Sequence, residues 1–388
     1  MITTINNKHN KLNVPNLRFK EFQGEWNSFL INDVCSEFKS GKNIKADSIS
    51  ESGEYPVYGG NGLRGYTSSY NHEGLYVLIG RQGALCGNVR SVNGKTYITE
   101  HAIAVAGNEK SNTSFLHYLF LKMNLGQFSD QSAQPGLAVT KLLKLKVILP
   151  SISEQTKIAR LLSLLDERIA TQNKIIDKLQ SLIKGLNDSL YAQYGGKVLT
   201  SFAELGTSYS GLSGKSAQDF GSGKPFITYL NVYSNNVINE NEFQYVAIKD
   251  DEKQNVAEYG DVLFTLSSET PREVGIGSVY LGKEKVYLNS FCFGIHITNA
   301  EIAFPPYLSY YVSSTPFRKF VYPYAQGSTR FNLCKADFEK ASIKLPTLEN
   351  QKRIYSILSH IDNKIITERQ MLDLYNSQKQ YLLRQMFI

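Results

Sequence analysis

The chain has 388 residues, 42% hydrophobic and 20% charged, an ordinary balance for a globular protein long enough for two or three domains. Its net charge of +7 permits a nucleic-acid partner without demanding one. No apolar run of 18 residues occurs, which excludes a membrane-spanning helix, and the four cysteines form no close pair or zinc spacing. The N-terminus "MITTINNKHNKLNVPN" lacks an apolar signal core, so we expect a cytoplasmic protein.

Residues 15–148 form the first predicted domain. Short apolar runs alternate there with Gly, Asn and Ser, as strands and turns do. The stretch "EGLYVLIGRQGALCGNVRSV" (73–92) predicts a strand, a glycine turn and a second strand. An aromatic helical stretch, "SFLHYLFLKM" (114–123), follows, and a strand then leads into Leu149-Pro150.

Residues 149–195 predict a long helix. Ser151 is a candidate N-cap, and Glu154 completes a capping box with it. Apolar side chains fill nine of ten seam positions over five heptads, which indicates a coiled coil. The two seam positions are Ile158, Leu165, Gln172, Leu179, Leu186 and Leu162, Ile169, Ile176, Ile183, Leu190.

Residues 196–344 form the second predicted domain, again with short strands and turns. The stretch "YGDVLFTLSSETPREVGIGSVYL" (259–281) predicts two strands around a longer turn, and "PPYLSYYVSS" (305–314) parallels the earlier aromatic helix. Outside these features the two domains have diverged heavily. The sequence therefore predicts two unlike domains.

Residues 345–388 repeat the long helix. A shift of 196 residues aligns 149–191 with 345–387 without a gap, and 12 of 43 positions are identical. Asn350 replaces the glutamate of the first capping box, so the second box is weaker. An apolar stripe of this length packs against protein, and the economical partner for each helix is the other. The predicted plan is domain, helix, domain, helix.

Stretches that resemble catalytic motifs do not meet the chemical requirements. "FPPY" (304–307) resembles the Asn/Asp-Pro-Pro-Tyr motif of amino-group methyltransferases, but Phe304 cannot bond an amine, so the prolines predict a helix start. "GLSGKS" (211–216) lacks the first glycine of a phosphate loop, although Lys215 could still meet a DNA phosphate. The six histidines show no metal or nucleophile pattern, and Asp250-Asp251-Glu252 reads as a solvated turn.

The pattern "LP-x-x-x-x-Q-x-x-I…L-x-x-x-D-x-x-I", present twice and closing two unlike domains, resembles the specificity subunit of type I restriction–modification systems. The stretches "YPVYGGNGLRGY" (55–66), "VLIGRQGALCGNV" (77–89) and "FITYLNVYSNNVI" (226–238) agree with this family. The resemblance covers nearly the whole chain after about residue 15.

The resemblance implies an α+β protein. Two α/β target-recognition domains would be separated by two long helices, packed as an antiparallel coiled coil about a pseudo-twofold axis. Each domain would read one half of a split, asymmetric double-stranded DNA target. Two methyltransferase subunits and two restriction subunits would bind this non-catalytic chain, and they would hold S-adenosylmethionine, ATP and magnesium.

Base reading requires side chains on positioned loops, and phosphate contacts fix the register on DNA. The candidates lie in Gly-, Ser- or Asn-rich stretches or near predicted strand ends. In the first domain they are Lys39, Lys42, Lys45, Asn61, Arg64, Tyr66, Arg81 and Gln82; in the second they are Lys215, Lys224, Tyr229, Asn231, Ser267, Arg272 and Arg330.

The charge of the two domains differs. Residues 15–148 contain 14 Lys/Arg and 11 Asp/Glu, whereas residues 197–344 contain 14 and 15. The second domain would therefore bind DNA through a local arrangement of charges or with help from its partners. The alternatives are a stand-alone coiled-coil DNA-binding or scaffold protein, and the specificity half of a fused restriction enzyme, for which this chain has no catalytic domain.

Overall fold

The computed structural model describes residues 2–4, 13–130 and 135–388, so most of the polar N-terminal stretch, including His9, lies outside it. The chain divides into two compact units. Unit 1 comprises residues 1–173 and 370–388, and unit 2 comprises residues 174–369. The two long helices are α4, Ile152–Tyr194, and α10, Leu348–Gln385, and each contributes one part to each unit.

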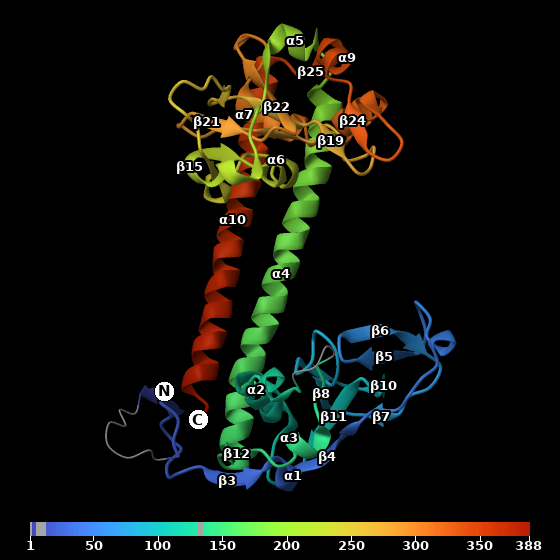
Figure 1. Ribbon diagram of the computed structural model, residues 1–388. Helices are drawn as coiled ribbons and strands as arrows, with labels where there is room; N and C mark the ends of the chain where they lie inside the picture. Colours follow the sequence, from blue (N-terminus) through green and yellow to red (C-terminus); the bar gives the residue numbers. More distant parts are fainter. Residues whose placement is uncertain (1, 5–12, 131–134) are drawn as a thin grey trace. The chain divides into compact units, whose positions relative to one another are not determined.

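Unit 1 contains two four-stranded sheets, and helix α2 lies beside the one that contains β8 and β11 (Figure 1). Its elements are β1 Ile2–Thr4, β2 Leu17–Phe19, β3 Asn27–Leu30, α1 Ile31–Val34, β4 Cys35–Ser40, β5 Tyr55–Gly59, β6 Gly62–Thr67, β7 His72–Glu73, β8 Tyr76–Gly80, β9 Val89–Val92, β10 Lys95–Ile98, β11 Ala102–Gly107, α2 Thr113–Met123, α3 Val139–Leu142 and β12 Lys146–Leu149. The sheet orders are β4-β11-β8-β9 and β6-β5-β10-β7. Strands β5 and β10 run parallel, and β3 pairs with β12 just before α4 begins.

Unit 2 repeats this topology with different side chains. Its elements are β13 Val198–Thr200, α5 Phe202–Leu205, β14 Gly206–Ser210, β15 Phe220–Ile227, α6 Tyr229–Ser234, β16 Gln244–Val246, β17 Val256–Ala257, β18 Val262–Thr265, β19 Ser267–Ser268, β20 Gly277–Val279, β21 Val286–Leu288, β22 Cys292–Ile297, α7 Pro305–Tyr311, α8 Thr315–Val321, β23 Ala325–Gln326, β24 Phe331–Leu333, α9 Lys335–Lys340 and β25 Ile343–Leu345. The sheet orders are β14-β22-β18-β20 and β16-β15-β21-β17, with β15 and β21 parallel and β13 paired with β25. The domains that the sequence predicts to be unlike thus differ in side chains and share one fold.

The central strands of both units are buried on both faces. In unit 1, Val77 of β8 belongs to the core beneath α2, and Leu78 belongs to the cluster that faces the second sheet. In unit 2, Val262 and Leu263 of β18 divide in the same way. Burial on both faces explains why these strands appear in the sequence as continuous apolar runs.

The long helices pack antiparallel within each unit, as predicted. In unit 1, Leu162 near the start of α4 shares a core with Met386 at the end of α10, and Lys379 pairs with Asp166 at 2.5 Å. In unit 2, Leu190 near the end of α4 shares a core with Ile354 near the start of α10. The seam therefore unites the beginning of one helix with the end of the other.

The repeated glutamine fastens each helix start to its own unit. The Gln155 side chain accepts from Asn112 N at 2.8 Å and donates to the carbonyl oxygens of Lys110 and Pro150, each at 2.9 Å. The second copy makes the same three bonds: Gln351 accepts from Phe304 N and donates to the carbonyl oxygens of Ile302 and Pro346. Both glutamines are fully buried, so these bonds explain why the pattern keeps Gln at this position.

A tyrosine and an aspartate form a second repeated contact. Tyr118 of α2 donates to Asp166 of α4 at 2.9 Å, and Tyr310 of α7 donates to Asp362 of α10. The aspartate belongs to the repeated helix pattern, and the tyrosine belongs to the aromatic helix that precedes it. Each repeat thus supplies two side chains, a glutamine and an aspartate, that bond its long helix to the domain that precedes it in the chain.

The capping box predicted for α4 is only half right. Ser151 Oγ accepts from Glu154 N at 3.4 Å, but the Glu154 carboxylate takes two 2.8 Å bonds from the Arg18 guanidinium instead of returning to the cap. Both side chains are almost fully buried. In the second repeat, Thr347 caps Asn350 N in the same way. The polar neutral residue there has no ion pair to form.

The helix start that the sequence predicts at "FPPY" is confirmed, because helix α7 begins at Pro305. The four cysteines are free. Within residues 2–4, 13–130 and 135–388, no helix is long and apolar enough to cross a membrane.

Candidate nucleic-acid interface

A short segment, residues 98–102, runs from the last residue of β10 to the first residue of β11 and connects loops of unit 1; we call it junction segment 1. It joins the loop after β4, the end of β5 and the loop after β8 through backbone hydrogen bonds. The bonds are Lys42 N to Ile98 O (3.0 Å), Thr99 N to Tyr58 O (2.9 Å), Arg81 N to His101 O (2.9 Å) and Gly41 N to Ala102 O (3.0 Å). Two loops and a strand end that the chain separates widely therefore meet at one place.

Junction segment 2, residues 288–292 between β21 and β22, makes the same four connections in unit 2. They are Leu212 N to Leu288 O (2.7 Å), Asn289 N to Ile227 O (3.0 Å), Leu266 N to Phe291 O (2.8 Å) and Gly211 N to Cys292 O (3.2 Å). Glycine is required before each first bond, because a Cβ on Gly41 or Gly211 would lie about 2 Å from a backbone oxygen of the junction segment. The two units therefore build the same backbone site.

The site is closed on one side by a returning segment in both units. Arg81 O accepts from Leu137 N at 2.9 Å, and Leu266 O accepts from Leu333 N at 2.8 Å. Gln82 forms a bridge with Gly136, whereas Ser267 pairs with Asn332 in β24. This equivalence shows which side chains occupy matching positions: Arg81 and Leu266, Gln82 and Ser267, His101 and Phe291.

Five of the eight candidates in the first domain gather around junction segment 1. They are Lys42, Asn61, Arg64, Arg81 and Gln82. The β5–β6 turn that carries Asn61 is close, because a Cβ on Gly60 would lie 3.6 Å from Arg81 N. Arg64 borders the same turn, with its Cδ 2.9 Å from an added Cβ on Gly59.

The other three candidates of the first domain lie on strands or at a loop end. Lys39 is exposed on β4 and pairs with Glu37 at 3.2 Å. Tyr66 is half-buried on β6 and pairs with Ser50 through backbone bonds. Lys45 is exposed beside a short 3₁₀-helix. None of the three takes part in the bonds of junction segment 1.

Two residues near junction segment 1 were missed by the sequence prediction. Arg90 of β9 reaches the β5–β6 turn, since a Cβ on Gly62 would lie 3.1 Å from its guanidinium carbon. His101 lies 3.1 Å from Gln82, measured from Nδ1 to Oε1. Arg90 follows the same glycine turn that Arg81 precedes, and this position in the sequence could have identified it. His101 becomes a neighbour of Gln82 only in the folded unit, so local sequence could not have identified it.

In unit 2 the candidates Tyr229, Ser267 and Arg330 line one pocket of about 290 Å³ at junction segment 2. Ser267 contributes mainly backbone: its side chain is nearly buried, and its carbonyl accepts from Tyr229 Oη at 2.8 Å. Leu230 and Phe291, both well exposed, complete the pocket and were missed by the sequence prediction. No sequence pattern points to Leu230 or Phe291, because exposed apolar residues are common on any protein surface.

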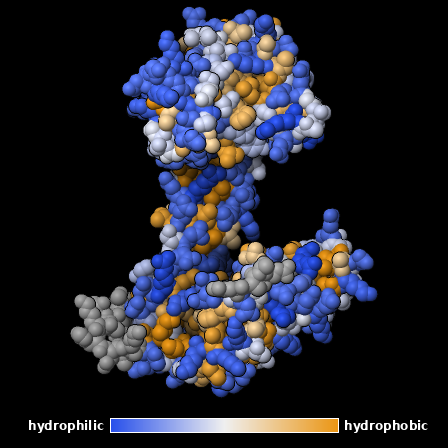
Figure 2. Space-filling view, in the orientation of Figure 1, coloured by the Kyte–Doolittle hydropathy of each residue, from blue (hydrophilic) through white to orange (hydrophobic). Residues whose placement is uncertain are grey.

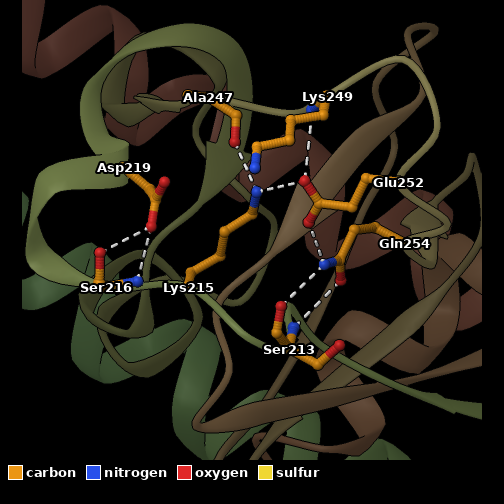
Figure 3. A network of polar contacts seen from close by, with 8 residues as sticks. All are labelled: Ser213, Lys215, Ser216, Asp219, Ala247, Lys249, Glu252 and Gln254. Atoms are coloured by element: carbon orange, nitrogen blue, oxygen red, sulfur yellow. Dashed lines mark hydrogen bonds and ion pairs between the residues drawn. The ribbon is translucent and has the colours of Figure 1, made fainter.

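Two candidates of the second domain are engaged inside the unit. Asn231 is fully buried, and its amide bonds to both backbone groups of Asn239 at 2.9 and 3.0 Å, so it holds a loop. Lys215 is also turned inward. Its ammonium donates to Ala247 O at 2.6 Å and pairs with Glu252 at 2.5 Å (Figure 3).

The loop "GLSGKS" is therefore held by an internal polar network. Gln254 bonds to the backbone of Ser213 in both directions and to Glu252, as Figure 3 shows. The hydrogen bond from the Lys215 ammonium, followed by that from the Gln254 amide, lowers the pKa of Glu252 to about 2. The reading of Asp250-Asp251-Glu252 as a solvated turn is thus wrong for Glu252, because its carboxylate meets Lys215 from a loop distant in sequence.

The remaining two candidates of the second domain are exposed. Lys224 lies on β15. Arg272 lies on the turn between β19 and β20, where it borders a basic hollow with Lys184, Arg318 and Lys319. No carboxylate lines that hollow among the residues that the structure describes. Three of these cations, Arg272, Arg318 and Lys319, belong to residues 197–344, which have no excess of cations, and Lys184 of α4 joins them at one place.

Comparison with known proteins agrees with this double architecture. The model of the type I restriction modification DNA specificity domain matches the chain twice, at residues 23–181 and 207–374. The Escherichia coli type I restriction enzyme EcoprrI specificity subunit is 43% identical over 154 residues, which span 39% of this chain and 38% of that protein. A putative type I restriction enzyme specificity subunit of Haemophilus influenzae is 24% identical over 380 residues, covering 92% and 93%.

Solved structures share the fold. The S subunit of a type I restriction–modification system from M. genitalium gives a TM-score of 0.62 at 15% identity and covers 97% of this chain and 99% of its own. Another chain, from a type I system whose complex assembly and conformational transition were described, gives 0.57 at 16% identity, with 94% and 98% covered. The chain belongs to the family of type I restriction–modification specificity subunits.

Proposed function

We propose that this chain is the DNA-reading subunit of a type I restriction–modification complex, in which unit 1 reads one half of a bipartite, asymmetric target and unit 2 reads the other. The observation that carries the proposal is the pair of junction segments, which share four backbone hydrogen bonds and differ in side chains. A common backbone presents reading groups at one place, and different side chains select different bases. This favours a DNA-reading subunit over a scaffold protein.

The surface of unit 1 has the chemistry that duplex DNA requires. Arg64, Arg81 and Arg90 can bond guanine edges or phosphates, and Lys42 can contact phosphates. Gln82 supplies the amide that matches an adenine edge. All five side chains border junction segment 1 or the turn beside it, so one face of DNA could meet them together.

The chain itself neither methylates nor cuts DNA in this proposal. S-adenosylmethionine, ATP and magnesium would be bound by the methyltransferase and restriction subunits. The position that must bond the target amine in a methyltransferase motif is occupied by Phe304, which directly precedes helix α7 here. The purified chain with DNA, magnesium, ATP and methyl donor should be inert, and turnover by a contaminant-free sample would contradict this assignment.

The long helices offer the docking surface for two copies of one partner, the methyltransferase subunit, with two restriction subunits joining the complex. Figure 2 shows apolar side chains exposed over α4 and α10. Exposed apolar residues on these helices include Leu164, Ile175, Leu182, Ile366, Met371 and Leu374. Ile175 and Met371 are related by the 196-residue repeat, so each helix presents an apolar side chain at the same position.

The test uses the complex with its methyltransferase partner and maps methylated sites across a genome. Arg81→Ala should lower discrimination at the first half alone, and Arg272→Ala should weaken the second half alone. A lost base-edge contact costs about 1–3 kcal/mol. Loss of both halves from either change would contradict separate reading. Failure of the chain to copurify with a methyltransferase subunit would favour the stand-alone alternative.

A further inference from the structure

The pocket at junction segment 2 combines aromatic walls with one cation, Arg330, and two carboxylates, Glu269 and Glu273. Tyr229 and Tyr233 stack with ring centroids 6.0 Å apart and 18° between the planes. Arg330 lies 5.9 Å from the centroid of the Phe291 ring, which orients the guanidinium. Glu269 lines the same pocket from the turn after β19. Aromatic walls beside one exposed cation, Arg330, and one exposed carboxylate, Glu269, are suited to bonding the edges of bases.

Arg330 and Glu269 have bonding capacity left for such a ligand. Neither forms an ion pair with another residue in 13–130 or 135–388, and both are exposed. The second acid of the pocket is already committed. Glu273 accepts from Tyr233 Oη at 2.7 Å, Thr270 Oγ1 at 2.8 Å and Ser268 Oγ at 3.1 Å, and these bonds lower its pKa. Glu273 therefore shapes the pocket, while Glu269 can accept from a ligand.

The turn that carries Glu269 is fixed by a half-buried arginine from another element. Arg318 of α8 donates to the carbonyl oxygens of Arg272, Val274 and Gly275 at 2.8, 2.7 and 2.5 Å. The same turn places Arg272 in the basic hollow with Lys184 and Lys319. One rigid turn thus separates a pocket with base-reading chemistry from a hollow with phosphate-binding chemistry.

We infer that this pocket reads a G·C base pair from the major groove, with Arg330 on guanine and Glu269 on cytosine; the inference rests on the proposed function. Guanine presents the acceptors O6 and N7, which match two N–H donors of arginine. Cytosine presents its N4 amino group, which donates to a carboxylate. No other base pair offers an acceptor pair beside an amino donor on the partner base in this arrangement. The cations of the adjoining hollow would hold the flanking phosphates.

The experiment uses the full chain in complex with its methyltransferase partner. Methylation is measured on a library of duplexes in which every position of both half-sites is varied. In Arg330→Ala, preference for one G·C pair of the second half should fall by about 5- to 150-fold. Glu269→Ala should reduce preference at the same pair, and the double variant should lose little more. Arg330→Lys should retain part of the preference, since lysine offers a point charge without the paired donors.

The matched control is Lys283→Ala, which removes one exposed cation beyond the opposite end of β20 in the same unit. It should leave both half-sites unchanged. The pocket assignment is overturned if Arg330→Ala and Glu269→Ala leave the second half-site unchanged, or if they affect an A·T pair. First-half discrimination is the internal reference. If it persists while the second half is unaffected, the pocket assignment fails alone; if the wild-type complex reads no bipartite target, the proposed function fails.

Discussion

Junction segments 1 and 2 carry matching backbone bonds and opposite surface chemistry. Unit 1 places Arg81, Gln82 and His101 at positions where unit 2 has Leu266, Ser267 and Phe291. The first site is polar and basic, while the second is an aromatic pocket with one cation, Arg330, and with further cations in a hollow alongside. The comparison teaches that hydrogen bonds between backbone groups fix where a reading site lies, and the side chains that are free of this task can diverge.

The starts of the two long helices likewise combine contacts that occur in both units with a contact that occurs in one unit. Gln155 and Gln351 make identical sets of bonds, whereas the buried Arg18–Glu154 pair occurs in unit 1 alone, since Asn350 stands at the matching position. The shared bonds fasten helix to unit in both copies. The Arg18–Glu154 ion pair makes the start of α4 dependent on a segment near the N-terminus.

The largest loss of stability is expected from breaking the Arg18–Glu154 ion pair. Glu154→Ala removes the carboxylate from a buried guanidinium and should destabilise unit 1 by about 3–5 kcal/mol. Glu154→Asn, which copies the second repeat, should cost a similar amount because Arg18 is still buried. Denaturant unfolding followed by circular dichroism measures the change. Glu167→Ala, at an exposed position of the same helix, is the control and should stay within about 0.5 kcal/mol.

The shared contact should respond equally in both copies. Gln155→Ala or Gln351→Ala strands one backbone N–H and two carbonyl groups, and each change should cost about 1–3 kcal/mol in its own unit. Hydrogen exchange of Asn112 N–H and Phe304 N–H reports the two units separately. Gln380→Ala, at an exposed site on α10, should change neither. A loss of stability from only one of the two substitutions would show that the two glutamines are not equivalent.

Acid sensitivity should distinguish the units. Burial, helped by Lys379 and opposed by Asp166, lowers the pKa of His117 from 6.5 to about 4. The folded histidine resists protonation, so its contribution to stability is complete above pH 6.5 and is lost as the pH falls toward 4. Unit 2 has Ser309 at the matching position, one residue before the repeated tyrosine. His117→Ser should flatten the pH dependence of the free energy of unfolding, measured by urea titrations at pH 7.5, 6 and 5. If this free energy falls with pH as steeply in the variant as in the wild type, His117 is not the source of the dependence.

The smallest effect belongs to the internal network of unit 2. The lowered pKa of Glu252, about 2 against an ordinary 4.5, means that its contribution is present above pH 4.5 and is lost as the pH falls toward 2. Glu252→Gln should weaken the acid dependence of unit 2 in that window. Asp250→Asn, an exposed neighbour, provides the comparison for a charge change without the Lys215 contact. Near-ultraviolet circular dichroism during acid titration would show the difference.

The antiparallel packing of the long helices was implied only by the family resemblance. The sequence by itself determined the repeat, the two long helices and the family. These features depend on periodicity and local spacing: Leu162 and Leu190 recur in register, and Pro305 marks a helix start wherever the chain folds. The sequence also located most of the loops at the first junction segment, because the glycine turn around Arg81 and the turn at Asn61 are local signals.

Tertiary structure alone decided which polar groups are spent inside the protein. Glu154 could cap its own helix, but Arg18, distant in sequence, claims it; Lys215 could face DNA, but Glu252 draws it inward. Asn231 carries the same side chain as a base-reading residue, yet it is buried against Asn239. The physical reason is that a buried charge or amide must find a partner, and the nearest partner in space is set by strand order and register, which local sequence spacing does not contain.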